Sequence, residues 1–245
     1  MITICIPAFD EASTIGLVLW RLRQEFEAHP REYEVVVLDD GSTDATAETL
    51  KPYARVMPLT VIRHPQRRGY PAALDALVRA AAARTRYPRR DALIIMQGDF
   101  TDPPEHLESL LKPFDGGADL VVAESGPVAG APTPVRRLRR LAPWMLRSYA
   151  RVPGVRDPLG SLRLVRVAVV RDAIKRAGAE PLTSAPGWAA NAELLARLAP
   201  FARRVETVTL EPRYDLRPRP TRVRAWSGAM ELLRFARANR GARAT

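Results

Sequence analysis

The stretch from Val35 to Thr46 restricts the fold of this chain more than any other. It reads VVVLDDGSTDAT: four apolar residues, two carboxylates, a Gly-Ser turn, and then Thr43, a residue type that can cap a helix. A short β-branched apolar run is typical of a strand buried in a parallel sheet, and open α/β sheets bind ligands at the carboxyl ends of such strands. The sequence therefore predicts that Asp39 and Asp40 lie at a ligand-binding edge.

The two carboxylates also indicate the kind of ligand. A carboxylate repels a phosphate group, but it accepts hydrogen bonds from base N–H groups and ribose hydroxyls. Asp39 and Asp40 therefore favour a nucleoside over a bare phosphate. Taken alone, the stretch agrees equally well with a purely structural role, because Asp39, Asp40 and Ser42 are also common turn and cap formers.

The remaining pattern alternates short apolar runs with segments of helical spacing. We expect strands over residues 2–6, 33–39, 59–63, 92–96 and 118–123, separated by helices over residues 11–26, 43–53, 72–86 and 103–111. This alternation predicts an α/β fold, with a mostly parallel central sheet and helices on both faces.

The chain after residue 125 is less regular. We expect a loop over 126–134, a basic helix over 134–150, a strand from 161 leading into a helix that ends at 177, a helix over 189–198, a strand over 204–211 and a last helix over 224–238. No repeat and no separating linker is evident, so residues 1–245 are expected to form a single domain.

Composition and charge narrow the function classes. The formal net charge of +11 suits an anionic partner, although the excess is nearly all Arg in an Ala-rich chain, as coding bias alone would give. Nucleic-acid binding is not expected, because aromatic interleaving and recognition motifs are missing. A single cysteine, Cys5, excludes an internal disulfide framework and a cysteine metal site.

The same sequence predicts a cytoplasmic protein. Its first residues, MITICIPAF, lack the basic region of a signal peptide. No apolar run approaches the roughly 20 residues of a membrane span. Docking onto the inner face of a membrane stays open.

Three further stretches favour a functional site over turn formation. Residues 6–16, IPAFDEASTIG, place Asp10 and Glu11 after a strand, at the same sheet edge as Asp39. Residues 67–77, RRGYPAALDAL, form a glycine turn that opens a helix behind two arginines. Residues 94–107, IIMQGDFTDPPEHL, end a strand in Gln97-Gly98-Asp99 and then start a helix.

With this order and spacing, the chain resembles the family 2 glycosyltransferases of the GT-A fold, in particular the dolichol-phosphate and polyprenyl-phosphate mannose or glucose synthase branch. The specific features are IPAFDE paired with the VVVLDDGSTDAT stretch, and an Asp followed by DPPE after the fourth strand. A GxGxxG or Walker loop, which dehydrogenases and NTPases need, is missing from the sequence. The resemblance implies inverting sugar transfer from a GDP- or UDP-sugar, most naturally to a polyprenyl phosphate.

The resemblance also implies a donor site in the first half of the chain, residues 1–125. The implied nucleotide-binding residues are Pro7, Phe9, Glu11, Asp39, Gly69, Gln97 and Gly98. Asp39 would bind the edge of the base, and Gly69 would let the chain pass the nucleotide. Mg²⁺ or Mn²⁺, bridging the donor diphosphate, would be held by Asp99 with Gln97 and Thr101.

The second half, residues 126–245, is the implied acceptor-binding half. DPLGSLR, Asp157 to Arg163, resembles the branch's segment near the acceptor, and Glu193 falls where the branch carries a Glu-Leu pair. A phosphate acceptor is already a nucleophile, whereas a hydroxyl acceptor needs a carboxylate to take its proton. Asp157 is the candidate for that base, with Glu193 second; a turn-forming Asp before Pro158 is the alternative reading.

A nucleoside diphosphate leaving group is a dianion, so cations must stabilise it. The arginines expected to do so, beside Arg163 in the DPLGSLR segment, are Arg136, Arg137, Arg217 and Arg222. Arg217 and Arg222 lie in RPRPTR, which resembles the branch's R-x-G-x-S-K segment. For the arginines between 136 and 140, a solvated helix face is an equally good interpretation.

Several positions depart from the branch's pattern. Its Asp-x-Asp metal motif reads Gln97-Gly98-Asp99 here, and Tyr70-Pro71 stands where Lys-Gly is usual. One carboxylate instead of two should weaken cation binding, because hard cations prefer charged oxygens. Two alternatives therefore stay open: a specialised-pathway glycosyltransferase with a soluble hydroxyl acceptor, and a degenerate member that binds nucleotide without catalysis.

The segment 135–151 has the composition of an interfacial helix. Six arginines are interspersed with apolar residues that include Trp144 and Leu141. A basic helix with an apolar face can lie on an anionic membrane surface. At that surface the enzyme could reach a polyprenyl phosphate acceptor. In the alternative reading, its apolar residues pack on the sheet.

Overall fold

The computed structural model of the protein describes residues 1–125 and 152–211. Beyond these ranges it describes only Thr133, Arg136, Arg137, Arg140, Leu141, Trp144, Met230 and Arg234. The expected loop at 126–134 and the expected helix at 224–238 therefore lie largely outside the described residues, as does the RPRPTR segment.

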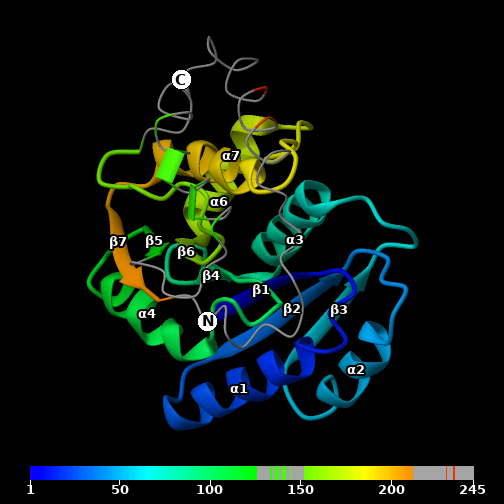
Figure 1. The fold of residues 1–245 in the computed structure, drawn as a ribbon. Helices are drawn as coiled ribbons and strands as arrows, with labels where there is room; N and C mark the ends of the chain where they lie inside the picture. The colour runs from blue at the N-terminus through cyan, green and yellow to red at the C-terminus, as the bar shows by residue number, and fades with distance from the viewer. Residues whose placement is uncertain are drawn as a thin grey trace.

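A seven-stranded sheet forms the centre of the molecule (Figure 1). Its strands are β1 (Ile2–Ala8), β2 (Tyr33–Asp39), β3 (Leu59–Arg63), β4 (Ala92–Ile95), β5 (Leu120–Ser125), β6 (Arg163–Arg166) and β7 (Val205–Leu210). They are ordered β3-β2-β1-β4-β6-β5-β7. Among these strands, β6 alone runs antiparallel to its neighbours, so the predicted mostly parallel sheet is confirmed.

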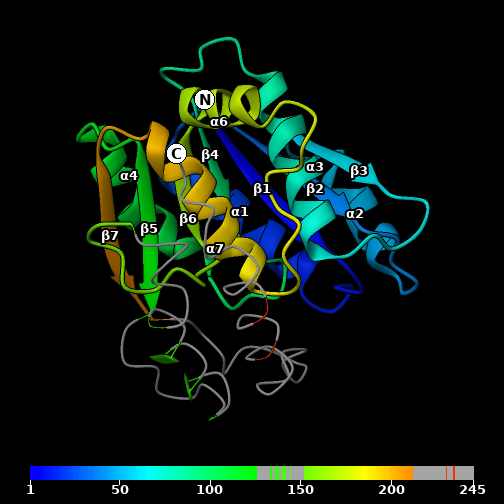
Figure 2. The ribbon, with the colours of Figure 1, turned by 90° about the horizontal axis from the view of Figure 1, so that it is seen from above.

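Helices cover both faces of the sheet, as expected. They are α1 (Ile15–Ala28), α2 (Thr46–Tyr53), α3 (Tyr70–Arg84), α4 (Leu107–Asp115), α6 (Val167–Ala177) and α7 (Ala189–Leu198), with short 3₁₀ turns η1 (Pro104–His106) and η2 (Ala199–Phe201). One apolar core joins α1, α2 and α4 to the sheet, and a second joins α3, α6 and α7 to its other face. Figure 2, seen from above, shows α3 and α7 on the near side of the strands and α1 behind them.

Strand β2 shows why a continuous apolar run was needed. Val35 and Val37 pack into the first core, whereas Val36 and Leu38 pack into the second. All four side chains are fully buried, and burial of each stabilises the fold by about 1.5–3 kcal/mol. Because β2 packs into both cores, Asp39 at its carboxyl end is held in a fixed position.

The insertion of β6 between β4 and β5 was not predicted. Because β6 runs antiparallel, its first residue, Arg163, pairs with Ile95 and Val122 near the carboxyl ends of β4 and β5. The segment before it, residues 157–162, is thereby brought to the edge where Asp39 lies. This topology makes one site from the two halves of the chain.

Three helices begin later than expected. α4 begins at Leu107 rather than residue 103, because the 3₁₀ turn η1 comes first. α1 begins at Ile15 rather than residue 11, because the backbone first forms a turn in which Thr14 N donates to the Glu11 carbonyl. α2 begins at Thr46 rather than residue 43, after the Asp44 side chain accepts a hydrogen bond from Thr46 N.

In the part of the chain that the structure describes, no helix is long and apolar enough to cross a membrane.

Candidate active site

The loops after β1 and β2 are joined by hydrogen bonds at the carboxyl edge of the sheet. Asp10 N donates to Ser42 Oγ at 2.9 Å, and Thr43 N donates to Asp10 Oδ1 at 2.8 Å. Glu11 N donates to Thr46 Oγ1 at 2.8 Å. The first motif and the VVVLDDGSTDAT stretch therefore meet, as their places after neighbouring strands predicted.

Asp39 is a fully buried carboxylate with one engaged oxygen. Its Oδ1 accepts a hydrogen bond from Ser42 N at 2.9 Å. Its Oδ2 has no hydrogen-bond partner among the described residues, although Arg63 Nε lies 3.4 Å away. Buried polar atoms are nearly always hydrogen-bonded, so an open carboxylate oxygen at a strand end marks a position for a ligand donor.

Asp40 has a different role from Asp39. Its carboxylate accepts hydrogen bonds from Arg68 N at 2.9 Å and Gly69 N at 2.8 Å, and its Oδ1 lies 2.7 Å from His64 Nδ1. Its oxygens therefore fix the loop of residues 64–69, and the expectation that Asp40 also faces a nucleoside stays a prediction. That loop approaches so closely that a Cβ on Gly41 would lie 2.6 Å from Arg67 N.

The residues expected around the base and ribose lie beside Asp39. Pro7 is buried in β1, in register with Leu38. The Arg67 guanidinium lies over the Phe9 ring, 4.1 Å from its centroid, in a cation–π contact. Glu11 is buried, and its Oε2 accepts a hydrogen bond from Thr14 Oγ1 at 3.1 Å.

Two glycines shape the same edge. A Cβ on Gly98 would lie 3.2 Å from the Ile15 side chain and 3.8 Å from Glu11 Cγ, so Gly98 brings the end of β4 against Glu11. Gly69 adopts φ +92, a conformation that favours glycine, and starts α3 while its N–H donates to Asp40.

The backbone is strained directly after the single carboxylate of the metal motif. Phe100 is buried with φ +63, a conformation that costs a non-glycine residue about 1–3 kcal/mol. Asp99 Oδ1 accepts a hydrogen bond from Thr101 N at 3.0 Å and tightens this turn. Such strain is typical of functional sites, and the sequence pattern did not predict it at this position.

The oxygens at the end of β4 fit a divalent cation that is only partly held by protein. The described residues contain no group of three or more His, Cys, Asp or Glu side chains that could hold a metal ion. Asp99, Gln97 and Thr101 offer one carboxylate, one amide oxygen and one hydroxyl, all hard ligands. Mg²⁺ and Mn²⁺ accept such a set when phosphates and water complete the coordination.

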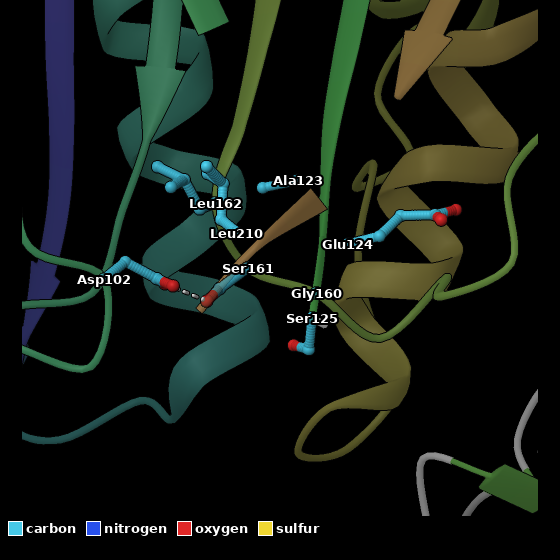
Figure 3. A pocket seen from close by; sticks show the side chains of 8 residues that line it. All are labelled: Asp102, Ala123, Glu124, Ser125, Gly160, Ser161, Leu162 and Leu210. Atoms are coloured by element: carbon cyan, nitrogen blue, oxygen red, sulfur yellow. Dashed lines mark hydrogen bonds between the residues drawn. The ribbon is translucent and has the colours of Figure 1, made fainter. Parts of the chain in front are cut away.

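The segment before β6 lines a small cavity together with the DPPE motif (Figure 3). Ser161 Oγ donates to Asp102 Oδ2 at 3.0 Å, which ties the two segments together. The cavity has a volume of about 10 Å³, room for about one water molecule, and is lined by Asp102, Ala123, Glu124, Ser125, Gly160, Ser161, Leu162 and Leu210. Asp157 lies nearby, buried, with its Oδ1 accepting a hydrogen bond from Leu159 N at 3.1 Å.

Arg163 does not face the diphosphate as expected. It is fully buried, where its guanidinium donates to the carbonyl oxygens of Asn191, at 2.8 Å, and Gly160. Burial lowers its pKa to about 10, while the nearby Tyr70 and Asp157 oppose that shift. In this arrangement Arg163 holds the backbone of residues 157–162, the segment expected to lie near the acceptor and called the acceptor segment below.

Glu193 is also engaged by the protein, and its role as the second candidate base stays a prediction. Its Oε2 accepts hydrogen bonds from Ser184 N at 2.6 Å and Ala185 N at 2.7 Å, and Oε1 accepts from Ser184 Oγ. Glu193 therefore fixes the loop that precedes α7.

The remaining arginines are only partly placed. Arg136 and Arg137 are helical and exposed, and Arg136 Nη2 lies 3.5 Å from Thr133 Oγ1. Arg217 and Arg222 lie outside the described residues. Their contact with a diphosphate stays a prediction.

Asn191 is a site residue that the sequence analysis missed. It is buried in α7 and contacts Tyr70, Leu159 and Arg163 through its side chain and carbonyl. The signal was present, because Asn191 and Glu193 are the two strongly polar side chains in the GWAANAELL run and Asn191 is the uncharged one. A buried Asn is usually fully hydrogen-bonded and therefore structurally committed.

Comparison with known proteins agrees with this geometry. Residues 3–173 match the sequence model of glycosyl transferase family 2. The chain is 29% identical over 174 residues to a bactoprenol glucosyl transferase of Shigella phage SfV, covering 70% of this chain and 53% of that protein. It is 24% identical over 175 residues to a dolichol-phosphate mannosyltransferase of Pyrococcus furiosus, covering 69% of this chain and 47% of that one.

Among solved structures, the glucosyl-3-phosphoglycerate synthase of Mycobacterium tuberculosis has the same fold. Its TM-score is 0.66 at 21% identity, with 98% of this chain and 79% of that chain covered, which confirms the expected GT-A architecture. The chain spans about half the length of the curated relatives it matches. Because the family model covers well over half of the chain, the protein belongs to glycosyl transferase family 2.

Proposed function

We propose that the protein transfers a sugar from a nucleoside diphosphate sugar to an acceptor, with inversion at the anomeric carbon. One observation carries the proposal: in a family 2 chain, the buried Asp39 presents an open carboxylate oxygen at the sheet edge that also carries Asp99. The first suits a nucleobase, and the second suits the cation of a diphosphate.

The geometry of Asp39 favours a uridine donor. Only Oδ2 is open, because Oδ1 is committed to Ser42 N. Uracil offers one imide N–H, whereas guanine offers two adjacent N–H donors that would call for both oxygens of a carboxylate. The Phe9 ring and the Arg67 plane add flat surfaces beside this position. A solved structure of the mycobacterial synthase holds Mn²⁺ and uridine diphosphate.

The reaction needs charge stabilisation more than acid–base chemistry. A divalent cation, held by Asp99 with the oxygens of Gln97 and Thr101, would neutralise the leaving diphosphate. A phosphate acceptor is already a nucleophile and would need no base, whereas Asp157 would take the proton of a hydroxyl acceptor. Arg163 keeps the Asp157–Gly160 backbone in place through the Gly160 carbonyl.

A polyprenyl phosphate at an anionic membrane surface is the proposed acceptor. The relatives named above are a bactoprenol glucosyl transferase and a dolichol-phosphate mannosyltransferase. On this chain, Arg136, Arg137 and Arg140 are exposed together with Leu141 and Trp144, as a surface-binding helix requires. The protein would then act as a peripheral enzyme on the cytoplasmic face.

A soluble hydroxyl acceptor is the second candidate. Asp102 lines the small cavity of Figure 3, and the buried Asp157 lies nearby in the segment before β6. Carboxylates would repel a phosphate acceptor, whereas one of them could take the proton of a hydroxyl acceptor.

Both candidates are tested in one assay. The protein is incubated with UDP- and GDP-sugars and Mn²⁺, with polyprenyl phosphate in phosphatidylglycerol vesicles or with a panel of soluble sugars, and products are identified by mass spectrometry. Transfer to the lipid supports the first acceptor, and transfer to a sugar supports the second. Nucleotide binding without transfer to either would indicate a degenerate member, and no nucleotide binding would refute the proposal.

A further inference from the structure

A chain of hydrogen bonds connects the metal motif to the acceptor segment. Gln97, after β4, donates from Nε2 to the hydroxyl of Tyr70 at 3.0 Å. That hydroxyl donates to Asn191 Oδ1 at 2.7 Å, and Asn191 Nδ2 donates to the carbonyl of Leu159 at 3.0 Å. Arg163 adds a second link, since it donates to the carbonyls of both Asn191 and Gly160.

The direction of this chain is fixed by its last member. A backbone carbonyl such as that of Leu159 only accepts, so the Asn191 amide must turn its NH₂ group toward it. Asn191 Oδ1 then faces Tyr70, whose single proton must go to it. The phenol oxygen is left as an acceptor, so Gln97 must present its NH₂ group there and keep its carbonyl oxygen for other ligands.

Tyr70 keeps that proton under ordinary conditions. Burial raises the pKa of Tyr70 to about 12, although Arg163 and the hydrogen bonds to Gln97 and Asn191 oppose the shift.

The two departures from the branch's pattern thus touch one another. A carboxylate at position 97 has no proton to give the phenol oxygen, and the phenol's own proton is already committed to Asn191. Gln97 and Tyr70 form a matched pair: the amide at 97 is compatible with Tyr70, whereas a carboxylate there would compete with Asn191 for one proton.

We propose that Tyr70 and Asn191 are positioning residues that present the Gln97 carbonyl oxygen to the donor's cation and couple donor binding to the segment 157–162. This inference rests on the proposed function, because it assigns the pair a role in that donor and acceptor site. This arrangement explains how a chain with one carboxylate in its metal motif could still bind a cation. The neutral ligand Gln97 is held in place by Tyr70 and Asn191, which also contact the segment before β6.

The competing explanation is that the chain of hydrogen bonds only joins α3 to α7. Tyr70→Phe separates the two, because it keeps the ring and removes the hydroxyl alone. Tyr33→Phe is the matched control, since the Tyr33 ring stacks on Phe26 at the start of β2, at the opposite edge of the sheet. Isothermal calorimetry measures Mn²⁺ binding in the presence of saturating UDP.

If Tyr70 positions Gln97, Tyr70→Phe weakens Mn²⁺ binding about three- to tenfold, as the loss of one orienting hydrogen bond would do. Tyr33→Phe leaves it unchanged. A lowered melting temperature in Tyr70→Phe with unchanged Mn²⁺ affinity would overturn the inference and leave the proposed function intact. Wild-type protein that binds neither UDP nor Mn²⁺ would overturn both.

A double-mutant cycle tests the matched pair directly. Gln97→Glu adds a carboxylate of nearly the same shape, so it should strengthen Mn²⁺ binding less in wild-type protein than in the Tyr70→Phe background, where no phenol competes. We expect the two backgrounds to differ by about threefold or more. Equal effects in both backgrounds would contradict the pairing.

Hydrogen exchange tests the coupling to the acceptor segment. Binding of UDP and Mn²⁺ should slow amide exchange in the peptide covering residues 157–162 of wild-type protein and of Tyr33→Phe. The slowing should be lost in Tyr70→Phe. Equal protection in all three proteins would show that donor binding reaches the segment by another route and would overturn the coupling.

Discussion

Asp39 and Arg63, at the ends of neighbouring strands, approach to 3.4 Å between Oδ2 and Nε without forming a hydrogen bond. Asp39 is fully buried, whereas the Arg63 side chain is 53% exposed and also donates to the Ser42 carbonyl. The guanidinium offsets part of the carboxylate's charge from the solvent side. It leaves Oδ2 as an acceptor for a ligand.

We expect Asp39→Asn to weaken UDP binding by tenfold or more while the fold is kept. Ser42 N must still find an acceptor, so the amide oxygen takes the Oδ1 place and the NH₂ group replaces Oδ2. The NH₂ group of the new Asn would then face the N–H of the base, and neither can accept a hydrogen bond. Leaving these donors unpaired costs about 1–3 kcal/mol of binding free energy. Calorimetry with UDP measures the loss.

The matched control is Asp119→Asn, at the amino end of β5, where the carboxylate pairs with Arg166 far along the strand from the site. It should leave UDP affinity unchanged. Equal UDP affinity of Asp39→Asn and wild-type protein would remove Asp39 from the base-binding site.

Asp40→Asn should cost stability more than Asp39→Asn. The Asp40 carboxylate is buried and accepts hydrogen bonds from two backbone N–H groups, and an amide can match only part of that pattern. We expect a loss of about 1–3 kcal/mol in the free energy of unfolding, measured by urea denaturation. If the stabilities of the two variants fell in the reverse order, the assigned roles of Asp39 and Asp40 would be exchanged.

The contrast between Asp39 and Asp40 shows where sequence reasoning stopped. The strand and its end were predictable, because a β-branched run with both faces buried has few other solutions. Which of two adjacent carboxylates is engaged depended on Arg68 and Gly69, whose loop reaches Asp40 from the next crossover connection. No local pattern encodes such a contact.

The second half was less predictable for the same reason. The strand at Arg163 was expected, but its insertion between β4 and β5 depends on pairing with strands far away in sequence. Glu193 and Arg163 matched family positions, yet the loop at Ser184 and the carbonyl of Gly160 engage them. Motif matching named residues that lie near one edge of the sheet, and the hydrogen bonds show which of them are already engaged by the protein.

Asp99→Asn should abolish both sugar transfer and its dependence on Mn²⁺. The amide oxygen can still accept from Thr101 N and keep the turn, so the change removes charge rather than structure. Without that charge the cation retains only neutral protein ligands at the end of β4. Product formation is followed with and without EDTA, and transfer by wild-type protein in excess EDTA would show that arginines alone neutralise the diphosphate.

The pKa of Tyr70 predicts how stability changes at alkaline pH. Its folded-state value of about 12 lies above the ordinary value of 10.0, so between these values the folded protein binds more protons than the unfolded chain. Stability from this group is therefore complete below pH 10 and is lost as the pH rises toward 12.

Arg163 acts with the opposite sign, because burial lowers its pKa to about 10 from its higher ordinary value, and stability from it rises with pH above 10. Tyr70→Phe removes the first effect, and it also removes a group that opposes the lowering of the Arg163 pKa, so the second effect can only grow. Its unfolding free energy should therefore fall less than that of wild-type protein between pH 10 and 12, as measured by urea denaturation. Parallel curves would mean that the hydroxyl of Tyr70 titrates normally.

The last prediction concerns the exposed basic helix positions. Leu141 is 54% and Trp144 is 65% exposed, and Arg136, Arg137 and Arg140 are exposed with them. If these residues meet an anionic membrane, each arginine contributes about 1 kcal/mol at low salt, so changing all three to Gln should reduce vesicle binding roughly a hundredfold. Co-sedimentation with phosphatidylglycerol vesicles at two salt concentrations measures this binding.

A control that changes the exposed Arg55, Arg86 and Arg89 to Gln removes the same charge elsewhere and should bind vesicles nearly as wild-type protein does. Equal losses in both triple variants would reduce the effect to net charge, and no binding of wild-type protein at low salt would favour the soluble hydroxyl acceptor.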